Sequence, residues 1–119
     1  METVDIQATL VAYAAVWNEP DEYHRQELIE QIWCENGVYE DRQHRVTGCQ
    51  ALREYIHAFQ KRYPDLRIEL TGEIVVEQEH VSFTWRACDP DGLAWLIRQD
   101  RATLTRDGKL QSIIGVLTE

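Results

Sequence analysis

Apolar and polar residues alternate through the last third of the chain, which is the pattern of strands that bury one face of a sheet. The alternation is clearest over residues 81–88, where the apolar positions are Val81, Phe83, Trp85 and Ala87. Asp-Gly pairs follow at 91–92 and 107–108, and such pairs are typical of tight hairpin turns. We therefore predict an antiparallel meander of three long strands, over residues 81–88, 93–105 and 110–117.

The first two thirds of the chain show helical spacing of apolar residues instead. The first helix, residues 3–18, places Tyr13 on the same side as Ile6, Leu10, Ala14 and Trp17. Asp21 is a candidate N-cap for a second helix, and Asn36-Gly37 is a candidate left-handed stop that ends it. The other predicted elements are that second helix over 22–34, short strands over 38–41 and 45–47, a helix over 49–63 and a strand over 66–76.

This order of elements, with helices first and a meander last, is typical of an α+β fold. We expect a single domain over residues 1–119, in which three N-terminal helices cover one face of a curved, mixed or antiparallel sheet. A curved sheet that helices close into a cone encloses a pocket. An apolar pocket with a few polar groups is the usual place for a small ligand to bind.

Asp100 is the residue that fits its predicted strand least well. Residues two apart on a strand share a face, so its face also carries Ala94, Leu96, Ala102 and Leu104. Burying a lone carboxylate costs free energy, so Asp100 must be paired, neutral or functional. The paired alternative would use Arg98 on the same face, or Arg86 or Arg101, and a guanidinium beside the carboxyl would keep it ionised.

Composition limits the classes of function. The formal charge is −9, with 21 acidic and 12 basic residues, so we expect neither a nucleic-acid partner nor an anionic membrane partner. We find no apolar run of membrane-spanning length and no signal-peptide pattern. The three widely spaced cysteines predict reduced thiols and a cytoplasmic protein. The four histidines lack metal-ligand spacing, so no metal site is predicted.

Several short strings, in the predicted order of elements, carry a family resemblance over nearly the whole chain. They are Leu10-Val-Ala-Tyr-Ala-Ala-Val-Trp-Asn18, Gly37-Val-Tyr-Glu-Asp41, Thr47-Gly48, Ala51-Leu-Arg-Glu-Tyr-Ile56, Ile68-Glu-Leu-Thr71, Val81-Ser-Phe-Thr-Trp85, and Asp100 with Asp107-Gly-Lys-Leu110. By these strings the chain resembles the nuclear transport factor 2-like superfamily. Within that superfamily it is most similar to the SnoaL-like and ketosteroid isomerase-like enzymes, which implies a cone-shaped α+β fold.

The resemblance also implies a trio for proton abstraction next to a carbonyl. In the isomerases, a tyrosine on the first helix and a protonated aspartic acid on a late strand hydrogen-bond the substrate oxygen, and an aspartate after the second helix is the base. The matching positions are Tyr13, Asp100 and Asp41. The resemblance implies no cofactor. Isomerisation, cyclisation and dehydration all begin with this step, so the reaction type stays open.

Each of these residues also has a purely structural explanation. Tyr13 fits a tyrosine at the edge of the core that bonds to backbone. Asp41 fits a carboxylate at a strand end that faces water, because acids are usually exposed. Arg42 follows it where the isomerases usually carry proline, and His44 lies close enough in sequence to reach the pocket mouth.

The resemblance also implies how the two faces of the sheet are used. The residues expected to line the pocket are Trp17, Phe83, Trp85, Ile113 and Gly115. If the large rings fill the cone, the substrate is smaller than a steroid. The opposite face carries Trp95, Ile97, Ile114 and Val116, and a row of exposed apolar residues suggests a partner surface. Members of the superfamily commonly dimerise there, so we expect a homodimer.

Two functions follow. The leading hypothesis is an enzyme that abstracts a proton from a modest apolar carbonyl compound, with Asp41 as the base and Tyr13 and Asp100 as hydrogen-bond donors to the oxyanion. The alternative is a non-catalytic ligand-binding or dimerisation module on the same fold. A core filled by Trp85 and Phe83, with Asp100 paired to Arg98, would favour the module. An open pocket where the trio converges would favour the enzyme.

Overall fold

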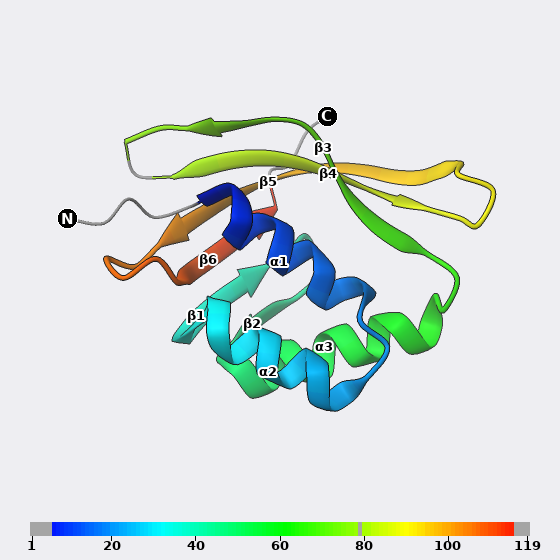
Figure 1. Ribbon diagram of the computed structural model, residues 1–119, viewed down its shortest axis with the longest axis horizontal. Helices are drawn as coiled ribbons and strands as arrows, with labels where there is room; N and C mark the ends of the chain where they lie inside the picture. The colour runs from blue at the N-terminus through cyan, green and yellow to red at the C-terminus, as the bar shows by residue number, and fades with distance from the viewer. Residues whose placement is uncertain (1–5, 79, 116–119) are drawn as a thin grey trace.

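The computed structural model describes residues 6–78 and 80–115, and within them three helices pack against one six-stranded sheet (Figure 1). The helices are α1 (Ile6–Asn18), α2 (Glu22–Ile32) and α3 (Cys49–Arg62). The strands are β1 (Trp33–Glu40), β2 (Arg45–Thr47), β3 (Arg67–Val76), β4 (Val81–Cys88), β5 (Ala94–Leu104) and β6 (Leu110–Gly115). The predicted α+β fold is confirmed. The predicted ends at residues 3–5 and 116–117 lie outside the described residues.

The sheet is mixed because its first and last strands run side by side. The strand order is β2-β1-β6-β5-β4-β3. β1 pairs with β6 in parallel, and the other neighbouring pairs are antiparallel. Glu40, the last residue of β1, is in register with Ile114. Asp41 therefore follows β1 at the place where β6 reaches Gly115, although the two residues are far apart in sequence.

Irregularities in strand pairing accompany the curvature of the sheet. The register shifts between Thr71 and Val75, where Gly72 has a φ of +71°. It shifts again between Ala87 and Cys88 on β4. An extra residue on one strand bends that strand and increases its twist. In Figure 1, β3, β4 and β5 arch over the helices, so the concave face of the sheet is turned toward α1.

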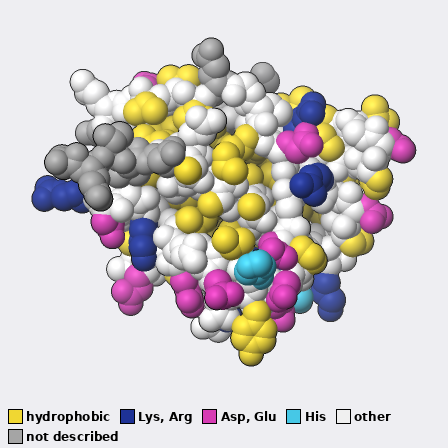
Figure 2. Space-filling model, viewed as in Figure 1, with side chains coloured by type: hydrophobic (Ala, Val, Ile, Leu, Met, Phe, Trp, Pro, Cys, Tyr) yellow, Lys and Arg dark blue, Asp and Glu magenta, His cyan; other side chains and the backbone are white. Residues whose placement is uncertain are grey.

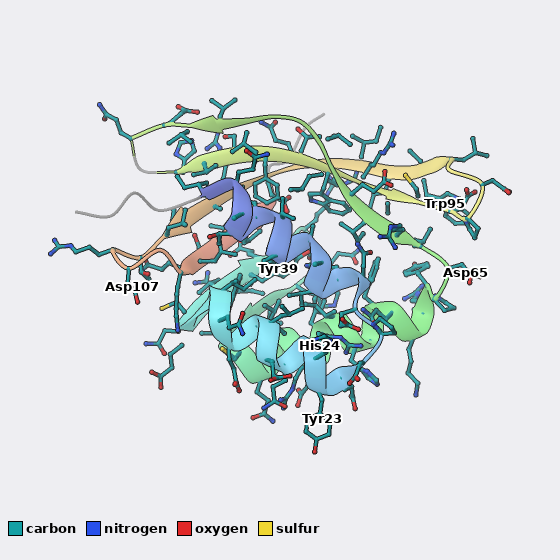
Figure 3. The ribbon with its side chains drawn as sticks, viewed as in Figure 1. Tyr23, His24, Tyr39, Asp65, Trp95 and Asp107 are labelled. Atoms are coloured by element: carbon teal, nitrogen blue, oxygen red, sulfur yellow. The ribbon has the colours of Figure 1, made fainter. Side chains whose placement is uncertain are left out.

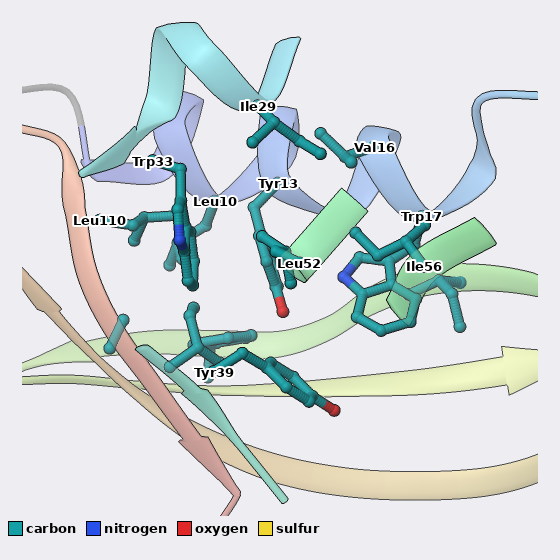
Figure 4. Packing of buried hydrophobic residues seen from close by; sticks show 14 of the residues in the cluster. Leu10, Tyr13, Val16, Trp17, Ile29, Trp33, Tyr39, Leu52, Ile56 and Leu110 are labelled. Atoms are coloured by element: carbon teal, nitrogen blue, oxygen red, sulfur yellow. The ribbon is translucent and has the colours of Figure 1, made fainter. Parts of the chain in front are cut away.

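The core lies between the helices and this concave face. Its most buried members come from every layer, and they include Leu10, Val16, Ile29, Leu52, Ile56, Ala102, Leu110 and Ile113. Fully burying one large aliphatic side chain contributes about 1.5–3 kcal/mol. The aromatic rings of α1 and β1 pack among them, as Figure 4 shows for Tyr13, Trp33 and Tyr39.

The prediction that the second helix runs to residue 34 is wrong. Trp33 is already extended, with φ −106° and ψ 131°, and it begins β1. Gly37 is not a left-handed helix stop, because its φ is not positive. A Cβ at Gly37 would lie 2.5 Å from Nε1 of Trp33. The glycine is therefore needed so that the buried indole can lie against the strand's own backbone.

The predicted N-cap of α2 and the two predicted hairpin turns are confirmed. The Asp21 side chain accepts hydrogen bonds from the backbone N–H groups of Tyr23 and His24, which are otherwise unpaired in the first turn of α2. Gly92 and Gly108 adopt φ values of +85° and +90° in the two hairpin turns of the meander. Side chains other than glycine rarely adopt such values.

The outer face of the sheet exposes the apolar side chains that the alternation placed there. Trp95 is 67% exposed, and Ile97 and Ile114 are exposed as well. Figure 3 shows Trp95 near the far end of the β4–β5 hairpin. Val116 lies outside the described residues, and the homodimer stays a prediction. No helix among the described residues is long and apolar enough to cross a membrane.

Candidate active site

A cavity of about 470 Å³ opens between α1, α3 and the concave face of the sheet. Pockets for small molecules usually have volumes of roughly 300–1,000 Å³. The cavity is lined by both acids and the tyrosine of the predicted trio and by most of the predicted lining residues, namely Tyr13, Asp41, Asp100, Trp17, Phe83, Trp85 and Gly115. The large rings therefore border the space without filling it.

Ile113 is the exception, and its prediction as a lining residue is wrong. Its side chain has no exposed surface and belongs to the core. It is in register with Tyr39 on one side and Ala102 on the other, and both of these residues are buried. Ile113 shares its strand face with Gly115, as the alternation indicated. The core covers that face at Ile113 and leaves it open to the cavity at Gly115.

Asp100 lies in the middle of the sheet, on β5, and its carboxyl is almost fully buried at 5% exposure. Nε1 of Trp85 donates a hydrogen bond to Oδ2 at 2.9 Å. Oδ1 receives no hydrogen bond from any described residue, and a Cβ on Gly115 would lie 3.6 Å from it. Burial raises the pKa of Asp100 to about 6, and the negative charge of Asp41 adds to this, while the Trp85 hydrogen bond and Arg98 oppose it.

The alternative in which an arginine pairs with Asp100 is not realised among the described residues. Nη1 of Arg98 donates to the carbonyl of Ile97 at 3.0 Å. Arg86 instead pairs with Glu69, with Nη2 2.9 Å from Oε1. Asp100 takes part in no salt bridge with another residue in the described part of the chain. The ionised carboxyl of Asp100 therefore has no contacting cation among these residues that would lower its pKa.

Asp41 lines the same cavity, but several hydrogen-bond donors surround its carboxylate. Its Oδ1 accepts hydrogen bonds from the backbone N–H groups of Gln43 at 2.9 Å and His44 at 2.8 Å. Its Oδ2 accepts one hydrogen bond from the hydroxyl of Tyr39 at 3.1 Å and another from the hydroxyl of Tyr55. Partial burial raises the pKa of Asp41, but these four hydrogen bonds outweigh burial and hold the pKa below its ordinary value of 3.8.

Tyr13 is held among aromatic rings, and its hydroxyl lies at the cavity. Its ring stacks on Trp33 with centroids 6.1 Å apart, and it meets the edges of Trp17 and Phe83. In Figure 4 the hydroxyl points away from α1, toward the sheet. Burial raises the pKa of Tyr13 well above its ordinary value, and the charge of Asp100 adds to this. Tyr13 is therefore a hydrogen-bond donor at any physiological pH.

Tyr39 and Tyr55 are site residues that the sequence analysis did not assign. Both line the cavity and donate to Asp41. Burial, together with nearby negative charge, raises the pKa of each hydroxyl. The available signal was spacing, since Tyr39 lies on β1 two residues before Asp41, which directly follows that strand. His44 does reach this cluster, with Nδ1 3.7 Å from Oδ1 of Asp41. No group of residues suited to a metal ion occurs in the described part of the chain.

The site thus holds two carboxyl groups whose surroundings shift their pKa values in opposite directions. Such a pair is the usual basis for assigning separate acid and base roles. Asp41 is ionised, and both of its oxygens accept hydrogen bonds. Oδ1 of Asp100 accepts no hydrogen bond from the residues that the structure describes, and the pKa of Asp100 is about 6. The arrangement can move a proton at Asp100 and donate a hydrogen bond from Tyr13.

Comparisons with known proteins agree with this fold. The profile of the SnoaL-like domain matches residues 10–113. Two similar solved structures are described by the activity assigned to them. The first is described as a putative isomerase of the SnoaL-like family from Agrobacterium tumefaciens str. C58; it is 29% identical, and the match covers 95% of this chain and 97% of that one with a TM-score of 0.87. The second is described as a putative polyketide cyclase from Sinorhizobium meliloti; it is 16% identical, and the match covers 85% of this chain and 90% of that one with a TM-score of 0.67.

A third similar structure has a nuclear transport factor 2-like fold. It is a protein of unknown function from Exiguobacterium sp. 255-15, 19% identical, covering 93% of this chain and 98% of that one with a TM-score of 0.73. The fold is therefore nuclear transport factor 2-like. The search of curated proteins found no match. Because the family profile spans most of the chain, the protein belongs to the SnoaL-like domain family.

Proposed function

We propose that the protein is a cofactor-independent enzyme that abstracts a proton next to the carbonyl group of a small, largely apolar compound, with Asp100 as the proton acceptor. Tyr13 donates a hydrogen bond to the carbonyl oxygen. This assignment differs from the one that the resemblance implied, in which Asp41 was the base. The reason for the exchange lies in the hydrogen bonds of the two carboxyl groups.

The observation that carries the proposal is the difference between the oxygens of Asp100 and Asp41. Oδ1 of Asp100 is free of hydrogen bonds from the described residues and lies beside Gly115, while Oδ2 is fixed by Trp85. Both oxygens of Asp41 already accept two hydrogen bonds each. A base needs a lone pair within reach of the substrate proton, and only Asp100 offers one without breaking existing bonds.

The raised pKa suits Asp100 to this role. With a pKa of about 6, roughly ten carboxyl groups are ionised for each one that is protonated at pH 7. A general base works best when its pKa lies near the working pH, because it is then both ionised and basic. Asp41 is a weaker base, since its pKa is lowered.

The proposed step balances without any co-reactant. The C–H bond next to the carbonyl breaks, its proton goes to Oδ1 of Asp100, and its electron pair passes into an enolate. The Tyr13 hydroxyl stabilises the enolate oxygen. One such donor lowers the activation barrier by about 3–4 kcal/mol. Asp100 then returns the proton to a different carbon in an isomerisation, or to the new alkoxide when the enolate attacks a second carbonyl.

Asp41 has a supporting role in this scheme. It fixes the hydroxyl groups of Tyr39 and Tyr55 in the cavity wall. Its negative charge also raises the pKa of Asp100. Replacing Asp41 should therefore lower the rate through position and pKa, and it should leave the proton acceptor in place.

Hydrogen–deuterium exchange at carbon tests the proposal without knowledge of the product. A panel of aryl alkyl ketones, β-keto esters and unsaturated cyclic ketones would be incubated with the protein in D₂O, and loss of the α-proton signal followed by NMR. We expect the wild type to accelerate exchange of at least one compound. Asp100→Asn should lose that acceleration by about 10²–10⁴-fold, and Asp41→Asn should lose about tenfold or less. Asp65→Asn, an exposed site, serves as the control.

Two results would overturn the proposal. Full exchange activity in Asp100→Asn, with loss in Asp41→Asn, would restore Asp41 as the base. Exchange of no compound above the Asp100→Asn background would favour the non-catalytic binding module.

A further inference from the structure

The cavity has a mouth formed by three residues, Arg42, Gln43 and Arg98. These are the exposed members of its lining, and the other lining residues are buried or half-buried. All three side chains end in N–H donors. Two of them carry a positive charge, although acids outnumber bases in the chain by 21 to 12. Figure 2 shows acidic side chains gathered along the lower edge of the molecule, where α2 lies in Figure 1.

Neither arginine of the mouth forms a salt bridge with a described acid. Arg42 forms no hydrogen bond or salt bridge with a described residue, and Arg98 donates only to the carbonyl of Ile97. The acids closest in sequence are already engaged. Glu40 pairs with Arg45 at 3.2 Å, Asp41 accepts four hydrogen bonds, and Asp100 is held by Trp85. Two arginines thus line one cavity, and neither has an ion pair with a carboxylate of the described residues.

The backbone fixes where these two arginines lie. Arg98 is opposite Trp85 in the β4–β5 register and two residues before Asp100, which places its Cα roughly 7 Å from that of Asp100 along the strand. Arg42 lies in the turn between β1 and β2. That turn is closed by the Asp41 N–H bond to the His44 carbonyl at 2.9 Å and by the two backbone bonds to the Asp41 carboxylate.

We propose that Arg42 and Arg98 bind a carboxylate carried by the substrate, which places an anionic end at the cavity mouth and a carbonyl end at Asp100 and Tyr13. This inference deepens the proposed function and rests on it for the identity of the inner end. Half-buried apolar side chains, including those of Leu70 and Leu96, also line the cavity. The substrate class is therefore a small keto acid whose remaining part is apolar.

The charges favour a singly charged group over a phosphate. Guanidinium groups bind planar carboxylates through paired N–H donors. Each additional negative charge on the ligand would also be repelled by Asp41, and by Asp100 when it is ionised. A carboxylate keeps most of the attraction of two arginines and meets the least repulsion from two acids.

The test compares two ligands that differ only in charge. Binding of 5-oxo-5-phenylpentanoate and of its uncharged amide would be measured by calorimetry at pH 7. We expect the wild type to bind the carboxylate about tenfold more tightly than the amide, because two partly exposed ion pairs give an effect of this size. The double variant Arg42→Gln/Arg98→Gln should lose that preference and keep its affinity for the amide.

A matched control removes an arginine from the other face of the same strand. Arg101 is exposed, does not line the cavity, and is in register with Ser82 and Ile114. Arg101→Gln should keep the tenfold preference. Equal binding of the two ligands by the wild type, no measurable binding of the carboxylate at millimolar concentration, or an equal loss of preference in Arg101→Gln would overturn the proposal.

The two proposals can fail separately. Asp100→Asn should abolish carbon exchange and retain the preference for the carboxylate. If the preference is present but no ketone exchanges, the anion site stands and the catalytic proposal fails. If a neutral ketone exchanges and the preference is absent, the catalytic proposal stands and the anion site is contradicted.

Discussion

Asp41 and Asp100 border the same cavity, yet the backbone around each gives them different chemistry. Asp41 follows the end of β1 and begins a turn, where the N–H groups of Gln43 and His44 have no strand partner and reach its carboxylate. Asp100 lies in β5, between β4 and β6, where it is in register with Phe83 and Gly115. Neighbouring strands use the backbone N–H groups there, so among the described residues only the indole of Trp85 donates a hydrogen bond to the carboxyl of Asp100.

This difference shows how position in a sheet sets the pKa of a carboxyl group. At a turn, free backbone donors stabilise the ionised form, and burial is compensated. In the middle of a strand the same residue type has no such donors, and burial raises its pKa. The following predictions test this contrast, from the largest expected effect to the smallest.

Asp100→Asn should stabilise the protein, with a gain that depends on pH. The folded pKa of about 6 lies above the ordinary 3.8, so ionised Asp100 costs the folded state about 3 kcal/mol above pH 6, and this cost disappears below about pH 4. We expect a gain of about 1–3 kcal/mol at pH 8 and almost none at pH 4. Urea unfolding at both pH values measures it, with Asp65→Asn as control. Equal stability of mutant and wild type at pH 8 would contradict the account.

Asp41→Ala should have the opposite effect on stability. Its folded pKa is lowered, so its contribution is present above the unfolded pKa and is lost as the pH falls through the folded pKa. The change leaves the hydroxyls of Tyr39 and Tyr55 and two backbone donors without their partner. We expect a loss of about 2 kcal/mol at pH 7 and a smaller loss at pH 3. A loss that is the same at both pH values would count against this role.

Trp85→Phe should increase the difference between the pKa values of Asp100 and Asp41. Without the indole donor the ionised form of Asp100 is less stable, so its pKa should rise above 6. Stability at pH 8 should fall by about 1 kcal/mol beyond any packing effect seen at pH 4. Trp95→Phe is a matched control, because Nε1 of Trp95 donates to Asp89 at 3.1 Å on the surface. If both variants show the same pH dependence, the buried pair is not special.

Tyr55→Phe should slightly reduce the difference between the pKa values of Asp41 and Asp100. It removes one of the four donors to Asp41, so the pKa of Asp41 should rise toward its ordinary value. We expect a loss of about 0.5–1 kcal/mol at pH 7, measured by urea unfolding. Tyr23→Phe is the control, since Tyr23 is 83% exposed and points away from the helices in Figure 3. A loss no larger than in the control would show that the Tyr55 hydroxyl contributes little.

The sequence was enough to predict the fold and the presence of Asp100 on an apolar face. Strand alternation and helical spacing depend on the local order of residues, and both are visible in a single chain. Asp100 was informative because it broke that alternation, between Leu96 and Ala102. The end of α2 was predicted wrongly because a glycine can either end a helix in the left-handed conformation or give room to a neighbouring side chain, and Gly37 does the second. The close approach of Trp33 to its backbone depends on packing that spacing does not reveal.

The partners of the site residues could not be predicted in the same way. Trp85 reaches Asp100 through the β4–β5 register and a choice of rotamer. The same applies to Arg98, which is adjacent on the strand face but does not pair with Asp100. The hydroxyl of Tyr55 meets Asp41 because α3 packs across β1, a tertiary contact between distant segments. These contacts decide which carboxyl is free to accept a proton.

The most direct test of the account is the pKa of each of the two carboxyl groups, measured by carbon-13 NMR of aspartate-labelled protein across a pH titration. The Asp41→Asn and Asp100→Asn variants would assign the two signals. We predict that Asp100 titrates near pH 6 and Asp41 below 3.8. An Asp100 signal that titrates below pH 4, with Asp41 titrating above it, would contradict the assignment of Asp100 as the proton acceptor.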